Sequence, residues 1–328
     1  SLKISNNNAL ASLTGFDALK EINGSLYIVG NNSLTNLEGM GGLMTVGNNL
    51  QIEQNQSLGS LEGLAELNAV GGDLIIYNDY SLTSLSGAEG LATVGGDLLI
   101  YENPHLLNLN GLEGLTAIGG KLEINENNTL VSLMNLAGEA TIGGELLIYE
   151  NPALTSLVGL EGVTSIVGDI TIRDNNSLLG LEGLENIDPG SVANLYIREN
   201  ANLYSCAAQA ICDYLSDPRG VVEICRNAPG CNSPGEIASE CGFPMPCLPY
   251  GNYYFFHQAE IDNFPLHYPG CTHLAGNVPI IGGDITNLLG LSAINSIEGR
   301  LRIHSNPELS SLEGLNGLDS IEIGRAHV

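Results

Sequence analysis

The sequence predicts a mainly β fold, a parallel β-solenoid of 24-residue leucine-rich coils with small disulfide-bonded helical caps. Three observations lead to this prediction: an asparagine that recurs every 24 residues, apolar residues at strand spacing before it, and a cysteine-rich segment where the repeat stops. Repeats with a fixed period of roughly 20 to 50 residues are typical of solenoids, in which each coil packs on its neighbours.

Each coil has a strand half and a turn half. In the strand half, Leu98 and Ile100 are two residues apart, which is the spacing of side chains on one face of a strand. The turn half carries further leucines and leads to a glycine pair before the next strand. At one corner of this turn, the recurring glycine predicts a backbone with positive φ, a conformation that glycine and asparagine tolerate best. That corner is occupied by Gly24, Asn48, Gly72, Gly96, Gly120, Gly144 and Gly168.

The recurring asparagine predicts a buried ladder of hydrogen-bonded side chains. An amide both donates and accepts, so it can satisfy turn backbone groups in its own coil and in the adjacent one. Asp79 fits such a ladder only if it is protonated or solvated, and we therefore expect Asp79→Asn to stabilise the fold. The ladder positions are Asn7, Asn31, Asn55, Asp79, Asn103, Asn127, Asn151, Asn175, Asn200 and, in a second array, Asn306.

The repeat divides the chain into two arrays. The first array is expected over residues 1–203, and a cysteine-rich C-terminal cap over 204–242, because the open end of a solenoid exposes its apolar interior. Within this cap, residues 206–215 and 234–241 have helical patterns.

A proline-rich hinge at residues 243–249 precedes the second array. Its N-terminal cap is expected over residues 250–287, with a short helical pattern at 258–264, and the repeat resumes over 288–322. Residues 323–328 abandon the repeat and resemble the translation of a sequencing adapter, so we expect a non-native tail on a fragment of a longer chain.

Seven cysteines favour disulfides over a metal site. The chain has no C-x-x-C pair, and no histidine lies among the five clustered cysteines. We expect Cys247 to pair with Cys271 and Cys225 to be a free, buried thiol. The sequence leaves open how the other four cysteines of the first cap pair, which are Cys206, Cys212, Cys231 and Cys241.

The pattern L-x-x-L-x-G-L-x-x-L-x-x-I-x-G-x-L-x-I-x-x-N, over residues 1–203 and 284–322, resembles the receptor L-domain family of insulin-receptor and EGF-receptor ectodomains. It is also similar to arrays in secreted surface proteins of Bacteroidetes-type bacteria, whose caps read much like CAAQAICDYL and NAPGCNSPGEIASEC. The resemblance implies a right-handed parallel β-solenoid, a secreted or outer cell-surface location, and ligand binding or adhesion rather than catalysis. It supplies no catalytic residues.

The charge and hydropathy of the chain restrict the classes of partner that we expect it to bind. With 10 Lys and Arg against 37 Asp and Glu, the formal charge is −27, which disfavours nucleic acid. No apolar run approaches the roughly 20 residues that cross a bilayer, so no membrane insertion is expected in this fragment. We expect a monomer.

Two columns of outward-facing residues are candidates for binding. Stacked tyrosines offer flat amphipathic surface for sugars or proteins, although aromatic residues are also ordinary on sheet surfaces. The neighbouring acids could bind Ca²⁺ as a cofactor, or could form a solvated edge. The ligand-binding candidates are Tyr77, Tyr101, Tyr149, Arg173 and Arg198, and the acids are Glu102, Glu126, Glu150, Asp174 and Glu199.

The expected function is therefore non-catalytic recognition. An exposed solenoid face would bind an extracellular glycan or protein ligand, and no catalytic triad, phosphate loop or zinc motif is present in the sequence. The alternative is a structural spacer that presents another domain.

Overall fold

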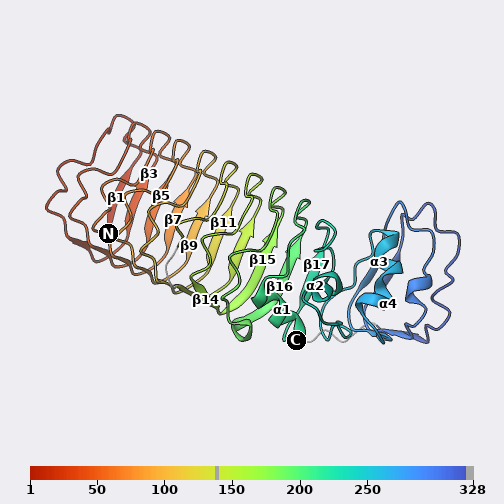
Figure 1. The fold of residues 1–328 in the computed structure, drawn as a ribbon. Helices are drawn as coiled ribbons and strands as arrows, with labels where there is room; N and C mark the ends of the chain where they lie inside the picture. Colours follow the sequence, from red (N-terminus) through yellow and green to blue (C-terminus); the bar gives the residue numbers. More distant parts are fainter. Residues whose placement is uncertain (137–139, 323–328) are drawn as a thin grey trace.

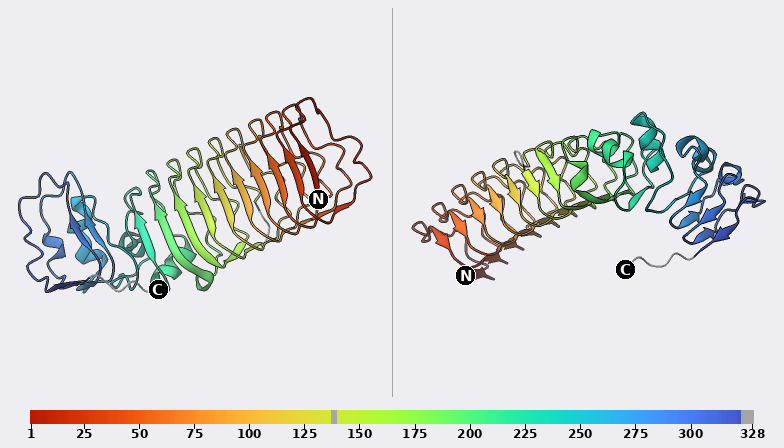
Figure 2. Two further views of the ribbon diagram at one scale, coloured as in Figure 1. Left: turned by 180° about the vertical axis from the view of Figure 1, so that it is seen from behind. Right: turned by 90° about the horizontal axis from the view of Figure 1, so that it is seen from below.

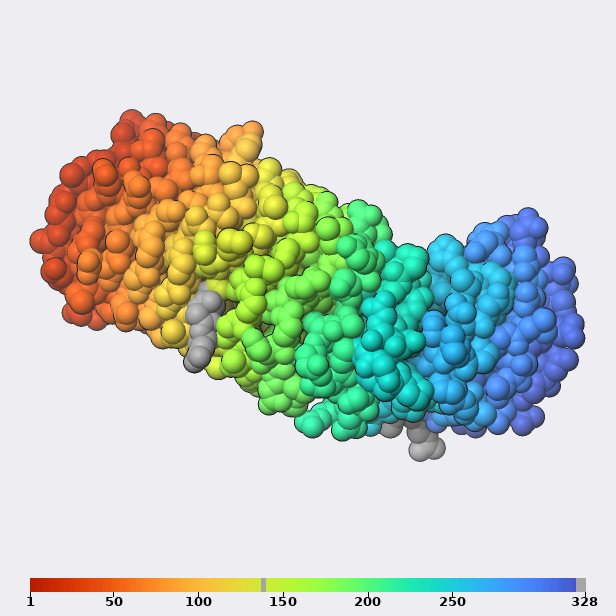
Figure 3. Space-filling view, viewed as in Figure 1, coloured from red at the N-terminus to blue at the C-terminus, as the bar shows by residue number. Residues whose placement is uncertain are grey.

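The computed structural model describes residues 1–136 and 140–322 and shows a mainly β parallel solenoid of about 13 turns, which confirms the predicted fold class. Successive strands lie side by side along one elongated body, with the N-terminus at one end (Figure 1). Figure 3 shows the chain colours following one another along the long axis of the visible face. Each coil is therefore neighboured by the coils before and after it in the sequence.

The main sheet is parallel and, within the described residues, has ten strands. The strand half of each coil supplies one strand, and equivalent residues of adjacent coils are paired in register, as Leu98 is with Leu122. Two apolar residues in each strand point inward while their neighbours point outward, because side chains alternate along a strand. The strands are β1 (Leu2–Ser5), β3 (Leu26–Val29), β5 (Leu50–Glu53), β7 (Leu74–Tyr77), β9 (Leu98–Tyr101), β11 (Leu122–Asn125), β13 (Leu146–Tyr149), β15 (Gly168–Arg173), β16 (Val192–Arg198) and β17 (Val222–Cys225).

A second parallel sheet of short strands lies in the turn halves of the same coils. Between the two sheets, the leucines of the repeat form columns with almost no exposed surface, as at Leu106, Leu109, Leu112 and Leu115. Burial of these columns is the main stabilising contribution to the coil stack. The short strands are β2 (Glu21–Ile22), β4 (Thr45–Val46), β6 (Ala69–Val70), β8 (Thr93–Val94), β10 (Ala117–Ile118), β12 (Ala140–Ile142) and β14 (Val163–Ile166).

The second array has the same organisation and lies at the opposite end of the body from the N-terminal coils (Figure 2). Its outer strands pair in parallel, and the short 3₁₀ helix η2 (Leu289–Leu291) lies in one of its turns. The C-terminal segment expected to be non-native, residues 323–328, lies outside the described residues. The strands are β18 (His273–Leu274), β19 (Val278–Ile280), β20 (Ser296–Ile297), β21 (Leu301–Ile303) and β22 (Ser320–Ile321).

Helices form where the sequence predicts them in the caps. α1 (Gln209–Ser216) and α2 (Pro234–Glu240) lie in the first cap, and the Ser233 hydroxyl caps α2 by accepting from the Glu236 N–H at 3.1 Å. The remaining helices are η1 (Pro189–Ser191), α3 (Gln258–Asp262) and α4 (Phe264–His267). No helix of the described residues is long and apolar enough to cross a membrane.

The main sheet continues through the segment expected to cap it. β17, from the cysteine-rich region, pairs with β16 along four residues. The Val222 N–H then donates to the Tyr250 carbonyl, and Phe255 bridges to Ile280 in the second array. The two arrays are therefore joined by shared hydrogen bonding as well as by the chain.

Three disulfides staple the two caps. The structure contains the predicted Cys247–Cys271 bridge, and it resolves the open connectivity of the first cap as Cys206–Cys231 and Cys212–Cys241. Cys225 is the free, buried cysteine, as predicted. Such bridges indicate an extracellular or otherwise oxidising environment.

The predicted positive-φ corner is wrong. None of Gly24, Asn48, Gly72 and the equivalent glycines has positive φ. Gly72 is small for another reason: a Cβ there would lie 2.2 Å from Asn49 Oδ1 of the preceding coil and 3.0 Å from a backbone carbon. Close stacking of coils, rather than backbone conformation, therefore favours glycine at position 72, whereas the equivalent position of the preceding coil holds Asn48. The left-handed corner instead lies immediately before each ladder residue, as at Glu126 with a φ of 55°.

Candidate ligand-binding face

The outward residues two positions before the ladder form one continuous column across the main sheet, which we call the Tyr/Arg strip. Strand register pairs each member with the next, so the predicted residues do lie together. Asn125 separates Tyr101 from Tyr149, so the three tyrosines do not form one uninterrupted stack. The strip consists of Tyr77, Tyr101, Asn125, Tyr149, Arg173 and Arg198.

One end of the strip is aromatic and apolar. The rings of Tyr77 and Tyr101 stack with centroids 4.5 Å apart and planes 25° apart. Ile75 and Leu99, two positions earlier on the same strands, pair with each other and are half-exposed on the same face. These four side chains form an amphipathic patch, because two tyrosine rings lie beside two aliphatic side chains.

The middle of the strip is polar. Asn125 is 4% exposed, its Oδ1 has no hydrogen-bond partner among the described residues, and its amide donates only a long 3.4 Å bond to Glu126. The Tyr149 hydroxyl donates to Glu123 Oε1 at 2.5 Å, and Lys121 Nζ lies 2.7 Å from the other oxygen of that carboxylate. Burial and the hydrogen bond to Glu123 both raise the pKa of Tyr149. This tyrosine therefore stays a neutral hydrogen-bonding group.

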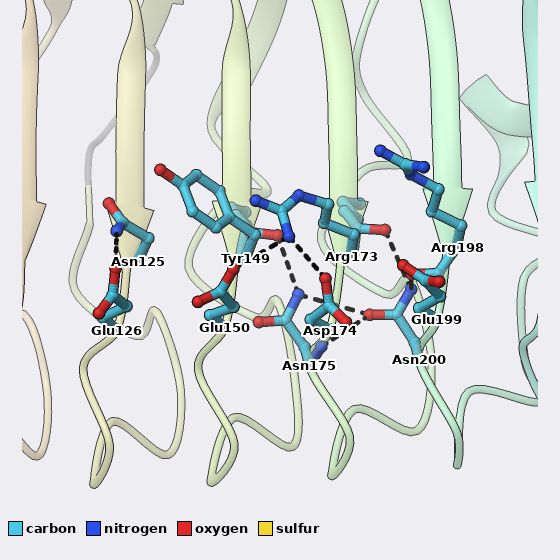
Figure 4. Close-up of polar contacts among 12 residues, drawn as sticks. Asn125, Glu126, Tyr149, Glu150, Arg173, Asp174, Asn175, Arg198, Glu199 and Asn200 are labelled. Atoms are coloured by element: carbon cyan, nitrogen blue, oxygen red, sulfur yellow. Dashed lines mark hydrogen bonds and ion pairs between the residues drawn. The ribbon is translucent and has the colours of Figure 1, made fainter.

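The two arginines are not free cations. The Arg173 guanidinium lies 4.3 Å above the Tyr149 ring and binds Glu150 at 3.0 Å and Asp174 at 2.6 Å (Figure 4). Arg198 pairs with Glu223 at 3.4 Å. This end of the strip is thus a charge-balanced surface rather than a basic one, because the neighbouring acids neutralise both guanidinium groups.

The acidic column occupies the left-handed corner between strand and ladder. Its acids share a φ of 54° to 59°, a conformation that non-glycine residues adopt only at a cost of about 1 kcal/mol or more. Glu150 and Asp174 bind Arg173, and Glu199 binds Arg226 at 2.9 Å. Within the part of the chain that the structure describes, no group of three or more His, Cys, Asp or Glu side chains is close enough to hold a metal ion. Three of the five acids in the column are thus paired with arginines. The column comprises Glu102, Glu126, Glu150, Asp174 and Glu199.

The asparagine ladder supports this face from inside. Asn103 is fully buried: its backbone N–H donates to Asn127 Oδ1 at 3.1 Å, and its own amide donates to the Ile76 carbonyl at 3.1 Å. The bond from backbone N–H to ladder oxygen repeats in every coil between Asn31 and Asn200, and Figure 4 shows it between Asn175 and Asn200. The amide-to-carbonyl bond repeats in the coils that carry asparagine and is absent at Asp79. Asn7, in the first coil, is exposed, and Asn306 is half-buried. The buried ladder fixes each corner and thereby aims the outward residues that precede it.

Asp79 is the one carboxyl in the ladder, and it is fully buried. Its Oδ1 accepts from the Asn55 N–H, whereas Oδ2 has no partner among the described residues. Burial raises the pKa of Asp79 from 3.8 to about 7, although the hydrogen bonds from Asn55 oppose this shift. The group is thus largely protonated in mildly acidic solution.

The ladder also extends beyond the positions that the sequence repeat indicates. Asn227 Oδ1 accepts from the Asn200 N–H at 3.0 Å, and the Asn227 N–H donates in turn to Asn232. Sequence reasoning missed Asn227 because α1 lengthens this coil to 27 residues. It also missed Ile75 and Leu99, which the period-two alternation with Tyr77 and Tyr101 could have revealed.

No protein-family model matches the chain, and the searches of curated proteins and of solved structures also find no match. The parallel solenoid of about 24-residue coils is consistent with a leucine-rich-like repeat fold.

Proposed function

We propose that this protein is a non-catalytic recognition module whose outer sheet face binds an extracellular glycan or protein ligand. The binding residues are those of the Tyr/Arg strip: Tyr77, Tyr101 and Tyr149 supply flat rings, while Arg173 and Arg198 supply hydrogen-bond donors. The observation that best supports this proposal is the stacked Tyr77–Tyr101 pair, which lies on an open face beside Ile75 and Leu99. Rigid aromatic rings with a polar tip contribute much contact area at little entropic cost.

The arrangement suits binding better than catalysis. The strip is an open surface whose charged groups are paired with one another, as Arg173 is with Glu150 and Asp174. An acid–base catalyst instead needs groups poised around a cleft from which water can be excluded.

The proposal also includes the location and the oligomeric state of this module. The three disulfides support export, and we place the protein in the secreted or outer cell-surface class, as a monomer of the receptor L-domain type found in bacterial surface proteins. Calcium is not required for binding in this scheme, because the acids beside Arg173 and Arg226 are already paired.

The experiment is a glycan-array and surface-protein binding screen with the whole chain, run with calcium and again with a chelator. We expect calcium-independent binding that the Tyr77→Ala/Tyr101→Ala double variant abolishes. Tyr204→Ala is the matched control, because Tyr204 is 56% exposed and lies outside the strip. Binding that survives the double variant, or that requires calcium, contradicts the proposed site.

A structural spacer is the second candidate, and one observation favours it. Ladder hydrogen bonds join every adjacent pair of coils from Asn7 to Asn227, which makes the first array a continuous rod. If the screen finds no ligand while the chain remains rod-shaped in small-angle scattering, the spacer is favoured.

A further inference from the structure

A groove on the second array differs in character from the Tyr/Arg strip. It has a volume of about 350 Å³, which is within the range of small-ligand sites and larger than a single ion needs. Two arginines, one tyrosine, two asparagines and one proline line it, and no carboxylate is among them. The lining residues are Asn252, Tyr254, Asn277, Pro279, Arg300 and Arg302.

The groove arises because a short side chain lies between two long side chains of the neighbouring coils. Pro279 pairs in register with Arg302, and the Phe255 N–H donates to the Pro279 carbonyl, so Tyr254, Pro279 and Arg302 follow one another in successive coils. Two coil spacings of about 4.8 Å place Tyr254 and Arg302 about 10 Å apart, with the small proline ring between them.

The floor and walls are held by backbone and amide contacts. Asn252 Oδ1 accepts from both the N–H and the side-chain amide of Asn277, at 2.9 and 3.0 Å, and Asn277 Oδ1 accepts from the Arg300 N–H at 3.0 Å. The Asn252 amide donates to the Tyr254 hydroxyl at 3.2 Å, and the Tyr254 ring stacks on Phe256. The tyrosine is thus positioned before any ligand arrives.

The charge of the groove is its distinguishing feature. Arg173, Arg198 and Arg226 each bind a carboxylate, but among the described residues neither Arg300 nor Arg302 forms an ion pair. Both side chains are exposed. In a chain with 37 acids and only 10 Lys and Arg, two adjacent unpaired guanidinium groups are a local exception to the overall charge of −27.

We infer that this groove binds a short acidic saccharide, with a uronic-acid carboxylate bound by Arg300 and Arg302. Guanidinium groups bind carboxylates through paired, charge-assisted hydrogen bonds. The Tyr254 ring offers a flat face to a sugar ring. Asn252 and Asn277 also line the groove, and each amide keeps a second N–H that can donate to a sugar hydroxyl group. The surrounding negative charge selects a short ligand over a long polyanion. This site is separate from the Tyr/Arg strip and does not depend on the function proposed for it.

The test uses isothermal titration of the whole chain with digalacturonate at low salt. We expect saturable binding, with the neutral disaccharide galactobiose at least 10-fold weaker. Either Arg300→Gln or Arg302→Gln should weaken binding roughly 10- to 100-fold, because each removes a charge-assisted contact. Arg302→Lys keeps the charge but loses the planar fork, and it should lie between wild type and Arg302→Gln.

Arg219→Gln is the matched control, because it removes one exposed positive charge outside the groove and should leave the affinity unchanged. Melting temperatures and circular dichroism establish that the variants are folded. Backbone amide chemical shifts of residues 252–254 and of Asn277 and Val278 report binding by a method that does not depend on the heat of binding. The inference is overturned if digalacturonate does not bind, if galactobiose binds equally well, or if both Gln variants retain wild-type affinity. Preference for galactose 6-sulfate or for a Glu-Glu dipeptide overturns the uronate assignment.

Discussion

Asp79 Oδ1 accepts a hydrogen bond of 2.7 Å from the backbone N–H of Asn55, in the coil before it, while the second oxygen of Asp79 has no partner among the described residues. At the equivalent position, Asn103 uses its amide to donate to the Ile76 carbonyl of the preceding coil. The carboxylate form of Asp79 cannot donate, so the fully buried ladder loses one bond at this coil.

The first prediction is that Asp79→Asn stabilises the protein in a pH-dependent way. The folded-state pKa of about 7 exceeds the unfolded value of 3.8, so the folded chain holds the proton more tightly. Its unfolding free energy therefore falls as pH rises from about 4 to about 7, by an amount of order 4 kcal/mol. Urea unfolding of both proteins at pH 4 and pH 8 should show the larger gain at pH 8.

The reverse substitution supplies the control for this prediction. Asn151→Asp should destabilise the protein, more at pH 8 than at pH 4, because Asn151 donates to the Ile124 carbonyl at 2.9 Å in an equally buried position. A stability difference between Asp79→Asn and wild type that is negative, or the same at both pH values, would contradict this account of the ladder.

The second prediction concerns the left-handed corner at Glu126. Its φ is 55° and its side chain is exposed. Glu126→Asn should raise the free energy of unfolding by up to about 1 kcal/mol, because asparagine tolerates this conformation better. Glu126→Val should lower it by about 1 kcal/mol or more, because a β-branched residue fits it worst. Thermal melts test this ordering, and equal melting temperatures for the two variants would refute it.

The third prediction is that Cys225 does not react in the folded protein. It is 4% exposed, and burial raises the pKa of its thiol to about 12, so almost no thiolate exists near neutral pH. A thiol reagent at pH 8 should release less than about one tenth of an equivalent from native protein and one equivalent after denaturation. Rapid full labelling without unfolding would show that the thiol is accessible.

The fourth prediction is that removing the Cys206–Cys231 bridge destabilises the cap by about 3 kcal/mol. The bridge closes a loop with a sequence separation of 25, which restricts the unfolded chain. The double variant Cys206→Ala/Cys231→Ala is compared with Cys225→Ala, which removes a buried sulfur without breaking a bridge. Similar urea midpoints for the two variants would mean that the bridge contributes little.

The repeat made most of the architecture predictable. Every coil buries equivalent residues against equivalent neighbours, so one pattern such as Leu98, Ile100 and Asn103 specifies strand, core and ladder in each coil. The glycine corner was predicted wrongly because the sequence shows that glycine recurs at positions such as Gly72 but not why. Only the stacked coils reveal that Asn49 of the coil before it occupies the space where a Cβ would lie.

Residue spacing along the chain was sufficient to predict the parallel solenoid, its period and the buried ladder, because each coil repeats the same local spacing. Contacts between side chains of different coils became known only from the folded structure: Arg173 with two acids, Cys206 with Cys231, Asn200 with Asn227, and the groove between Tyr254 and Arg302. Insertions such as α1 break the sequence period while the stack of strands continues. Contacts across such insertions depend on packing in three dimensions, which the spacing of residues along the chain does not specify.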